Sequence, residues 1–87
     1  MIEIMKFGAK WCQPCKRYDP ILDEVVGDRD DVFLTKVDIE EDPALASKYQ
    51  VMSVPFTVFR RGDEVLGGFK GATTAAKLNG LIDGFKE

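Results

Sequence analysis

The most informative segment of the chain is residues 11–16, Trp11-Cys12-Gln13-Pro14-Cys15-Lys16. It follows a short apolar run, residues 2–7, that ends at Gly8 and is typical of a buried strand. Beyond it, apolar side chains recur at i, i+3, i+4, i+7 and i+8 from Tyr18, which predicts a helix over residues 12–26 with Pro20 inside it. Cys12 should therefore lie at the N-terminus of this helix, with Cys15 one turn further on.

This placement predicts a reactive thiol. Unpaired N–H groups at a helix N-terminus favour the thiolate of Cys12, and the neighbouring Lys10 and Lys16 act in the same direction. Thiolate is the species that attacks disulfides, and Cys15 is close enough to resolve a mixed disulfide formed on Cys12. Pro14 suits an early helical position, where its missing N–H costs nothing. We expect thiol–disulfide exchange through a reversible Cys12–Cys15 disulfide.

Two other interpretations of the cysteine pair stay open. A C-x-x-C sequence is half of a tetrahedral zinc site, but the chain has no His and no third Cys, so a metal would need ligands from another molecule. An inert buried pair is the second alternative. We expect neither a metal nor an organic cofactor, because 87 residues leave little room for a cofactor cavity.

Composition bears on the class of binding partner and on the cellular location. The net charge of −3 comes with no basic stripe, which argues against nucleic acid. No apolar stretch approaches the roughly 18 residues that span a membrane, and Met1 does not open a secretory signal. We expect a cytoplasmic monomer that forms a single domain over residues 1–87.

The rest of the chain alternates strand and helix patterns. A strand over residues 32–37 is followed by a short helix that begins at Asp42-Pro43. Strands over residues 56–60 and 64–69 flank the turn sequence Arg61-Gly62-Asp63. Thr73 should cap a last helix, whose buried stripe is Leu78, Leu81, Ile82 and Phe85. The predicted order is βαβαββα, an α/β fold.

The chain resembles the thioredoxin family in residues 11–16, in Pro20-Ile21-Leu22-Asp23-Glu24, in Val51-Met52-Ser53-Val54-Pro55-Phe56, and in Gly71. The resemblance implies a thioredoxin-like four-stranded mixed sheet flanked by three helices, and a cis Val54–Pro55 bond facing the sulfurs. It also implies a groove for an extended client segment, lined by Trp11, Val54, Pro55, Lys70 and Gly71. From the residues alone, Pro55 could instead be an edge or strand-start proline, and Trp11 could fill the core.

The resemblance further implies an activity. A thioredoxin reduces protein disulfides, is recharged by an NADPH-dependent thioredoxin reductase, and serves clients such as a ribonucleotide reductase. Two alternatives remain, a glutaredoxin-type reductase fed by glutathione and a non-catalytic binding module built on the same fold.

Several positions depart from the family pattern. The strand and helix that usually precede the residue here numbered 2 are missing, which should leave residues 32–37 at a sheet edge, as in glutaredoxin-like relatives. Lys6 stands where the family usually has a buried aspartate, and Lys36 stands where it often has that aspartate's lysine partner. We expect Lys6 to lower the pKa of Cys15, balanced by Asp38 or Glu3, unless its ammonium reaches the surface. Gln13 replaces the usual glycine between the cysteines and should tune the reduction potential.

Overall fold

The computed structural model describes residues 1–86 and contains four strands and three helices in the expected order. These elements are β1 (Ile2–Gly8), α1 (Gln13–Gly27), β2 (Val32–Asp38), α2 (Pro43–Lys48), β3 (Phe56–Arg61), β4 (Glu64–Lys70) and α3 (Ala75–Phe85). Each observed boundary lies within one residue of the limits expected for the first helix and the four strands. The βαβαββα order and the α/β class are confirmed.

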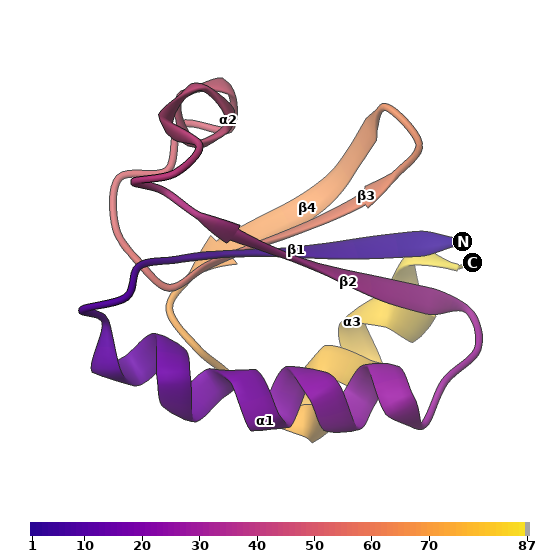
Figure 1. Cartoon of the computed structure of the whole chain (residues 1–87). Helices are drawn as coiled ribbons and strands as arrows, with labels where there is room; N and C mark the ends of the chain where they lie inside the picture. Colours follow the sequence, from indigo (N-terminus) through magenta and orange to yellow (C-terminus); the bar gives the residue numbers. More distant parts are fainter. Residues whose placement is uncertain (87) are drawn as a thin grey trace.

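The strands form one mixed sheet in the order β2-β1-β3-β4. β1 runs parallel to β2 and antiparallel to β3, and β3 and β4 form an antiparallel hairpin. Helices α1 and α3 cover one face of the sheet, and α2 lies on the other (Figure 1). Within the described residues β2 is an edge strand, as its predicted place in a four-stranded sheet requires.

The central strand β1 is buried along its whole length. Its alternate side chains Ile2 and Ile4 join the core beneath α1 and α3, whereas Met5 and Phe7 join a second core beneath α2. A strand covered on both faces has no need to alternate apolar with polar residues. This explains the nearly continuous apolar run in the sequence and places the end of β1 deep inside the molecule.

The last helix starts one residue later than predicted. Its N-cap is Thr74 and not Thr73, and the Thr74 hydroxyl accepts the Lys77 N–H at 3.2 Å. Two adjacent threonines offer the same cap chemistry, so only the path of the chain decides between them. The predicted stripe of this helix packs inward as expected, with two residues fully and two partly buried, namely Leu78, Ile82, Leu81 and Phe85.

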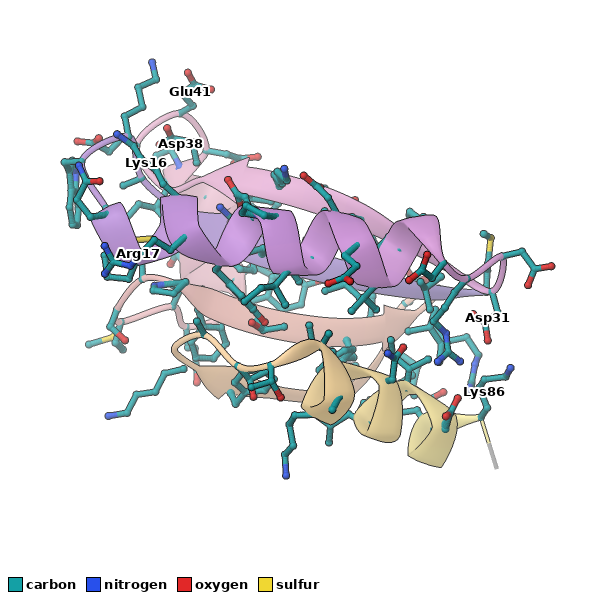
Figure 2. The ribbon with its side chains drawn as sticks, turned by 90° about the horizontal axis from the view of Figure 1, so that it is seen from below. Lys16, Arg17, Asp31, Asp38, Glu41 and Lys86 are labelled. Carbon is teal, nitrogen blue, oxygen red and sulfur yellow. A yellow bond between two sulfur atoms is a disulfide. The ribbon has the colours of Figure 1, made fainter. Side chains whose placement is uncertain are left out.

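The first turn of α1 lies at the end of the molecule opposite the start of β1 and the end of α3 (Figure 1). At that terminal end Arg29 makes a bidentate pair with Asp31 and also bonds Asp83, while Lys86 Nζ lies 2.5 Å from Asp31 Oδ2. Figure 2 shows Asp31 and Lys86 side by side there. The hydrogen bonds from Arg29 and Lys86 hold the pKa of Asp31 well below its usual value. The network ties α3 to the start of β2.

Candidate functional site

Cys12 is the N-cap residue of α1, as the sequence predicted. Its backbone is extended, and its Sγ accepts the backbone N–H of Cys15 at 3.2 Å. Pro14 occupies the first turn, where a backbone N–H would have no helical partner. An N-cap acceptor satisfies one orphan donor of the helix, and a thiolate at this place would also interact favourably with the helix dipole.

Cys12 and Cys15 form a disulfide with a Cα–Cα distance of 5.3 Å. Both residues are buried, at 3% and 2% exposure. Cys15 faces the end of β1, because a β-carbon built on Gly8 would lie only 3.3 Å from Cys15 Sγ. The missing side chain of Gly8 therefore leaves the space that Cys15 Sγ occupies.

The Lys6 ammonium lies near the same sulfur. The β-carbon position of Gly8 is 3.1 Å from Lys6 Nζ and 3.3 Å from Cys15 Sγ, so the two atoms are separated by no more than the sum of these distances. Lys6 is 6% exposed, which excludes the alternative in which it reaches the surface. Its Nζ lies 2.7 Å from Asp19 Oδ1. This ion pair compensates a buried carboxylate oxygen that has no hydrogen-bond partner among the described residues.

The prediction that Asp38 or Glu3 balances the charge of Lys6 was wrong, because the carboxylate that pairs with it is Asp19. Glu3 lies on the opposite face of β1, where it pairs with Arg60 and accepts the Thr35 hydroxyl. Asp38 accepts the backbone N–H of Glu40 at 2.8 Å. Because side chains alternate across a strand, Glu3 could not have faced α1 together with Lys6.

Lys36 is the register partner of Lys6 on β2, yet it is not brought to the disulfide. Its ammonium lies 3.2 Å from Asp23, one turn beyond Asp19 on α1. Gln13 and Lys16 are exposed on the first turns of α1, and Figure 2 shows Lys16 at the same end of the molecule as the disulfide. Of the lysines predicted to tune the cysteines, Lys6 is therefore the one whose ammonium reaches Cys15 from the sheet.

The Val54–Pro55 bond is cis, as the resemblance implied. Phe56 follows directly and pairs with Phe7, so Pro55 continues β3 toward the end of β1 where Cys15 packs. The Pro55 carbonyl accepts the Gly71 N–H at 2.7 Å, and Gly71 has a φ of 93°, which favours glycine. The structure thus joins two parts of the expected groove that are far apart in sequence.

The other two residues expected to line the groove, Trp11 and Lys70, lie at the surface. Trp11 is 62% exposed, which rules out the alternative that it fills the core, and Lys70 is exposed at the end of β4. Val54 is half-buried beside the buried Pro55. An exposed indole next to a disulfide offers contact area to a partner.

Sequence reasoning missed a buried polar link between the two halves of the site. The Tyr18 hydroxyl and Thr57 Oγ1 lie 2.9 Å apart, and both residues are almost completely buried. The bond joins α1, one turn after Cys15, to β3, two residues after Pro55. Desolvation raises the pKa of the Tyr18 phenol above its usual value. Tyr18 carried only the signal of a core position in the helix pattern.

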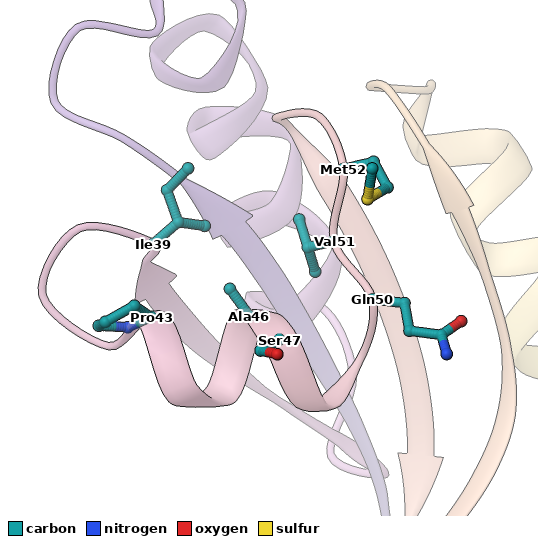
Figure 3. Close-up of a pocket in the computed structure, with 7 residues that line it drawn as sticks. All are labelled: Ile39, Pro43, Ala46, Ser47, Gln50, Val51 and Met52. Carbon is teal, nitrogen blue, oxygen red and sulfur yellow. The ribbon is translucent and has the colours of Figure 1, made fainter.

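A surface pocket of about 650 Å³ lies between α2 and the segment that leads to Pro55 (Figure 3). Its lining is mostly apolar and holds no titratable side chain; the lining residues are Ile39, Pro43, Ala46, Ser47, Gln50, Val51 and Met52. Met52 is 92% exposed at its rim. Since the Ile39 N–H donates to the Gly8 carbonyl at 2.9 Å, the pocket begins beside the strand end that supports Cys15. It can supply contact surface but no acid–base chemistry.

Residues 1–86 contain no cluster of three or more His, Cys, Asp or Glu side chains arranged to hold a metal ion. No helix in this range combines the length and the apolar character that a membrane span needs.

Comparison with known proteins gives a consistent family. The thioredoxin family model matches residues 2–84. A thioredoxin of Staphylococcus epidermidis is 42% identical over 66 residues, which cover 74% of this chain and 64% of that protein. The chain thus spans a little under two thirds of the length of this relative.

Solved structures agree. A single-site mutant of a thioredoxin from Halobacterium salinarum has a TM-score of 0.88 at 31% identity, covering 99% of this chain and 75% of the other. Mitochondrial thioredoxin 3 from Saccharomyces cerevisiae, in its oxidised form, has a TM-score of 0.85 at 30% identity, with 94% and 77% coverage.

Proposed function

Because this chain belongs to the thioredoxin family, we propose that it is a thiol–disulfide oxidoreductase that reduces protein disulfides through Cys12 and Cys15. One observation carries the proposal: Cys12 Sγ caps α1, accepts the Cys15 N–H at 3.2 Å, and is bonded to the Cys15 sulfur. A sulfur in this position is stabilised as an anion once the disulfide is reduced.

The reaction has two exchanges. The Cys12 thiolate attacks one sulfur of a client disulfide, forming a mixed disulfide and releasing the other client sulfur as a thiolate that takes a proton from solvent. The Cys15 thiol then loses its proton to solvent and attacks Cys12 Sγ. The Cys12–Cys15 bond forms, the bond to the client breaks, and the second client thiolate leaves. Two electrons pass to the client, and the protein ends as the disulfide.

The groove that holds the client is proposed to consist of Trp11, Val54, Pro55, Lys70 and Gly71. The exposed indole of Trp11 and the half-buried Val54 support this role, because an extended segment can bond to backbone beside Pro55 while its side chains contact the indole. The apolar pocket beside Met52 extends this surface toward α2. The proposed working unit is a monomer.

The proposed electron donor is an NADPH-dependent thioredoxin reductase, and the proposed clients are protein disulfides, a ribonucleotide reductase among them. A reductant of this kind works in a compartment with a reducing thiol pool, such as the cytoplasm. No bound cofactor takes part in the two exchanges.

The test is a coupled assay with insulin as the client. Wild type should accelerate reduction of insulin by dithiothreitol, and Cys12→Ser should abolish the acceleration. Supplying NADPH with thioredoxin reductase, or glutathione with glutathione reductase, should give turnover with the first donor only. Turnover with glutathione alone would favour the glutaredoxin-type interpretation. If insulin is not reduced faster with thioredoxin reductase, with glutathione or with dithiothreitol, the chain is a binding module.

A trapping experiment separates the roles of the cysteines. In Cys15→Ser the mixed disulfide on Cys12 cannot be resolved, so the variant should accumulate a covalent adduct with a client peptide. The matched Cys12→Ser variant keeps one thiol and the same fold, and it should accumulate no such adduct. The reverse pattern would reverse the assignment of nucleophile and resolving thiol.

A further inference from the structure

We infer that the Lys6 ammonium is shared between two anions, pairing with Asp19 while the disulfide is closed and with the Cys15 thiolate when the site is reduced. The inference deepens the proposed function and rests on it for its catalytic meaning. Asp19 thereby becomes a positioning residue for the resolving thiol, because it holds the cation in place and competes for it.

The geometry brings the three groups together. Asp19 follows Cys15 by four residues on α1, so both side chains lie on the same face of the helix. Lys6 projects from β1 toward both, with its Nζ 2.7 Å from Asp19 Oδ1 and near Cys15 Sγ beside Gly8. A cation this deeply buried needs an anion, and among residues 1–86 Asp19 is the one carboxylate paired with it while the sulfurs are bonded to each other.

Reduction changes the charge balance at this place. A second anion then forms within reach of the same ammonium, in surroundings where charges interact strongly. Asp19 Oδ1, the oxygen that Lys6 contacts, is buried, but the Asp19 side chain as a whole is 30% exposed, so its carboxylate keeps some contact with water when Lys6 turns toward the sulfur. Cys15 is 2% exposed, so water stabilises its thiolate less than it stabilises the Asp19 carboxylate. The cation should therefore favour the sulfur in the reduced state.

The other charged and titratable groups around Lys6, among the described residues, are already engaged. On β2, Asp38 is the register partner of Gly8 and accepts the backbone N–H of Glu40 at 2.8 Å. On β2, Lys36 is paired with Asp23. Between α1 and β3, the Tyr18 hydroxyl is bonded to Thr57, the register partner of Lys6. Glu3 is on the opposite face of β1. None of these groups competes for the Lys6 ammonium.

Lys6 neither gives nor takes a proton in this scheme. The Cys15 proton leaves to solvent, and the positive charge makes that loss easier by stabilising the anion that remains. An opposite charge within about 4–6 Å changes a pKa by about 1–3 units, and competition from Asp19 should leave an effect near the lower end, about one unit or tenfold in thiolate fraction.

The experiment measures Cys15 directly in a Cys12→Ser background, where it is the only thiol and its thiolate absorbs in the far ultraviolet. Lys6→Met should raise the pKa of Cys15 by about one unit, and Lys6→Arg should restore it. Asp19→Asn should lower it, because the competing anion is gone. Asp19→Asn leaves β1 unchanged, so the inference can still be tested if Lys6→Met fails to fold.

Lys36→Met is the matched control. It removes the same kind of strand lysine from the same kind of pair with an α1 aspartate, but one turn further from the sulfurs, and it should leave the titration of Cys15 unchanged. An unchanged pKa in folded Lys6→Met, or an unchanged or raised pKa in Asp19→Asn, would overturn the inference. The titration needs no client, so a failure to reduce insulin would count against the proposed function and not against the shared cation.

Discussion

Replacing Tyr18 by Phe should test how firmly the helix that carries the cysteines is held to the strand that follows Pro55. The change removes one oxygen from the core and leaves the ring in place. Tyr18 is 1% exposed and Thr57 is 0% exposed, so Thr57 Oγ1 would lose its partner where water cannot replace it. Leaving a buried polar group without a hydrogen bond costs about 1–3 kcal/mol. In a domain of this size each kcal/mol lowers Tm by roughly 4–8 °C.

The assay is a double-mutant cycle by urea and thermal unfolding. Tyr18→Phe and Thr57→Val should each destabilise the fold, because each strands the oxygen or hydroxyl of the other residue. The double variant removes both partners and should lie within about 1 kcal/mol of wild type. The m-value should not change, since the exposed surface on unfolding stays the same.

The same hydroxyl predicts a pH dependence. Burial raises the pKa of folded Tyr18 above the usual value of 10.0, so the protonated phenol stabilises the fold fully below pH 10.0. This contribution is lost as the pH rises above 10.0 through the folded pKa. Tyr18→Phe should therefore show a shallower loss of stability in alkali than wild type.

Two results would refute this reasoning. If Tyr18→Phe unfolds at the same urea concentration as wild type, the hydroxyl is not a buried link. If the two single penalties add in the double variant, the two groups do not depend on each other.

Three further predictions concern other parts of the fold. Gly68→Ala would put a β-carbon 2.9 Å from the Thr57 carbonyl oxygen and should lower stability by about 1–3 kcal/mol in urea unfolding, whereas Gly80→Ala meets no atom within 4 Å and should be neutral or stabilising. Asp31→Asn should flatten the loss of stability below pH 3.8. The lowered pKa of Asp31 stabilises the fold above pH 3.8, and this contribution disappears as the pH falls through the folded pKa. Equal acid unfolding profiles for variant and wild type would contradict this. Trp11→Ala should leave Tm within about 2 °C of wild type and raise the KM for insulin, since its side chain is mostly in solvent; a large fall in Tm would instead place the indole in the core.

The elements of the fold were predictable because their signals are local. The helix pattern after Tyr18, the Asp42-Pro43 start of α2 and the glycine of the hairpin turn each act within a few residues. Gly62 has a φ of 59°, as a tight turn after Arg61 requires. The choice of Thr74 over Thr73 was not predictable, since adjacent threonines carry the same local signal.

The two sulfurs of the candidate site were predictable, and part of their surroundings was not. The cysteine spacing and the helix pattern place Cys12 at the helix start without further information. The cis state of Val54–Pro55 followed only from the family resemblance, because an isolated X-Pro bond is usually trans. The Tyr18–Thr57 bond requires knowing that β3 passes under the second turn of α1, which no local pattern reveals.

The counter-charge of Lys6 was mispredicted for a reason that also explains the observed pairing. Aspartates recur on one face of α1 at Asp19 and Asp23, and lysines stand side by side in register on β1 and β2 at Lys6 and Lys36. The sequence contains both rows but not the angle at which the helix crosses the sheet, and that angle decides which aspartate meets which lysine. Lys36 pairs with Asp23, so of these two lysines Lys6 is left to pair with Asp19. The Lys36–Asp23 pair, one turn further along α1, therefore helps to keep the Lys6 ammonium near Cys15.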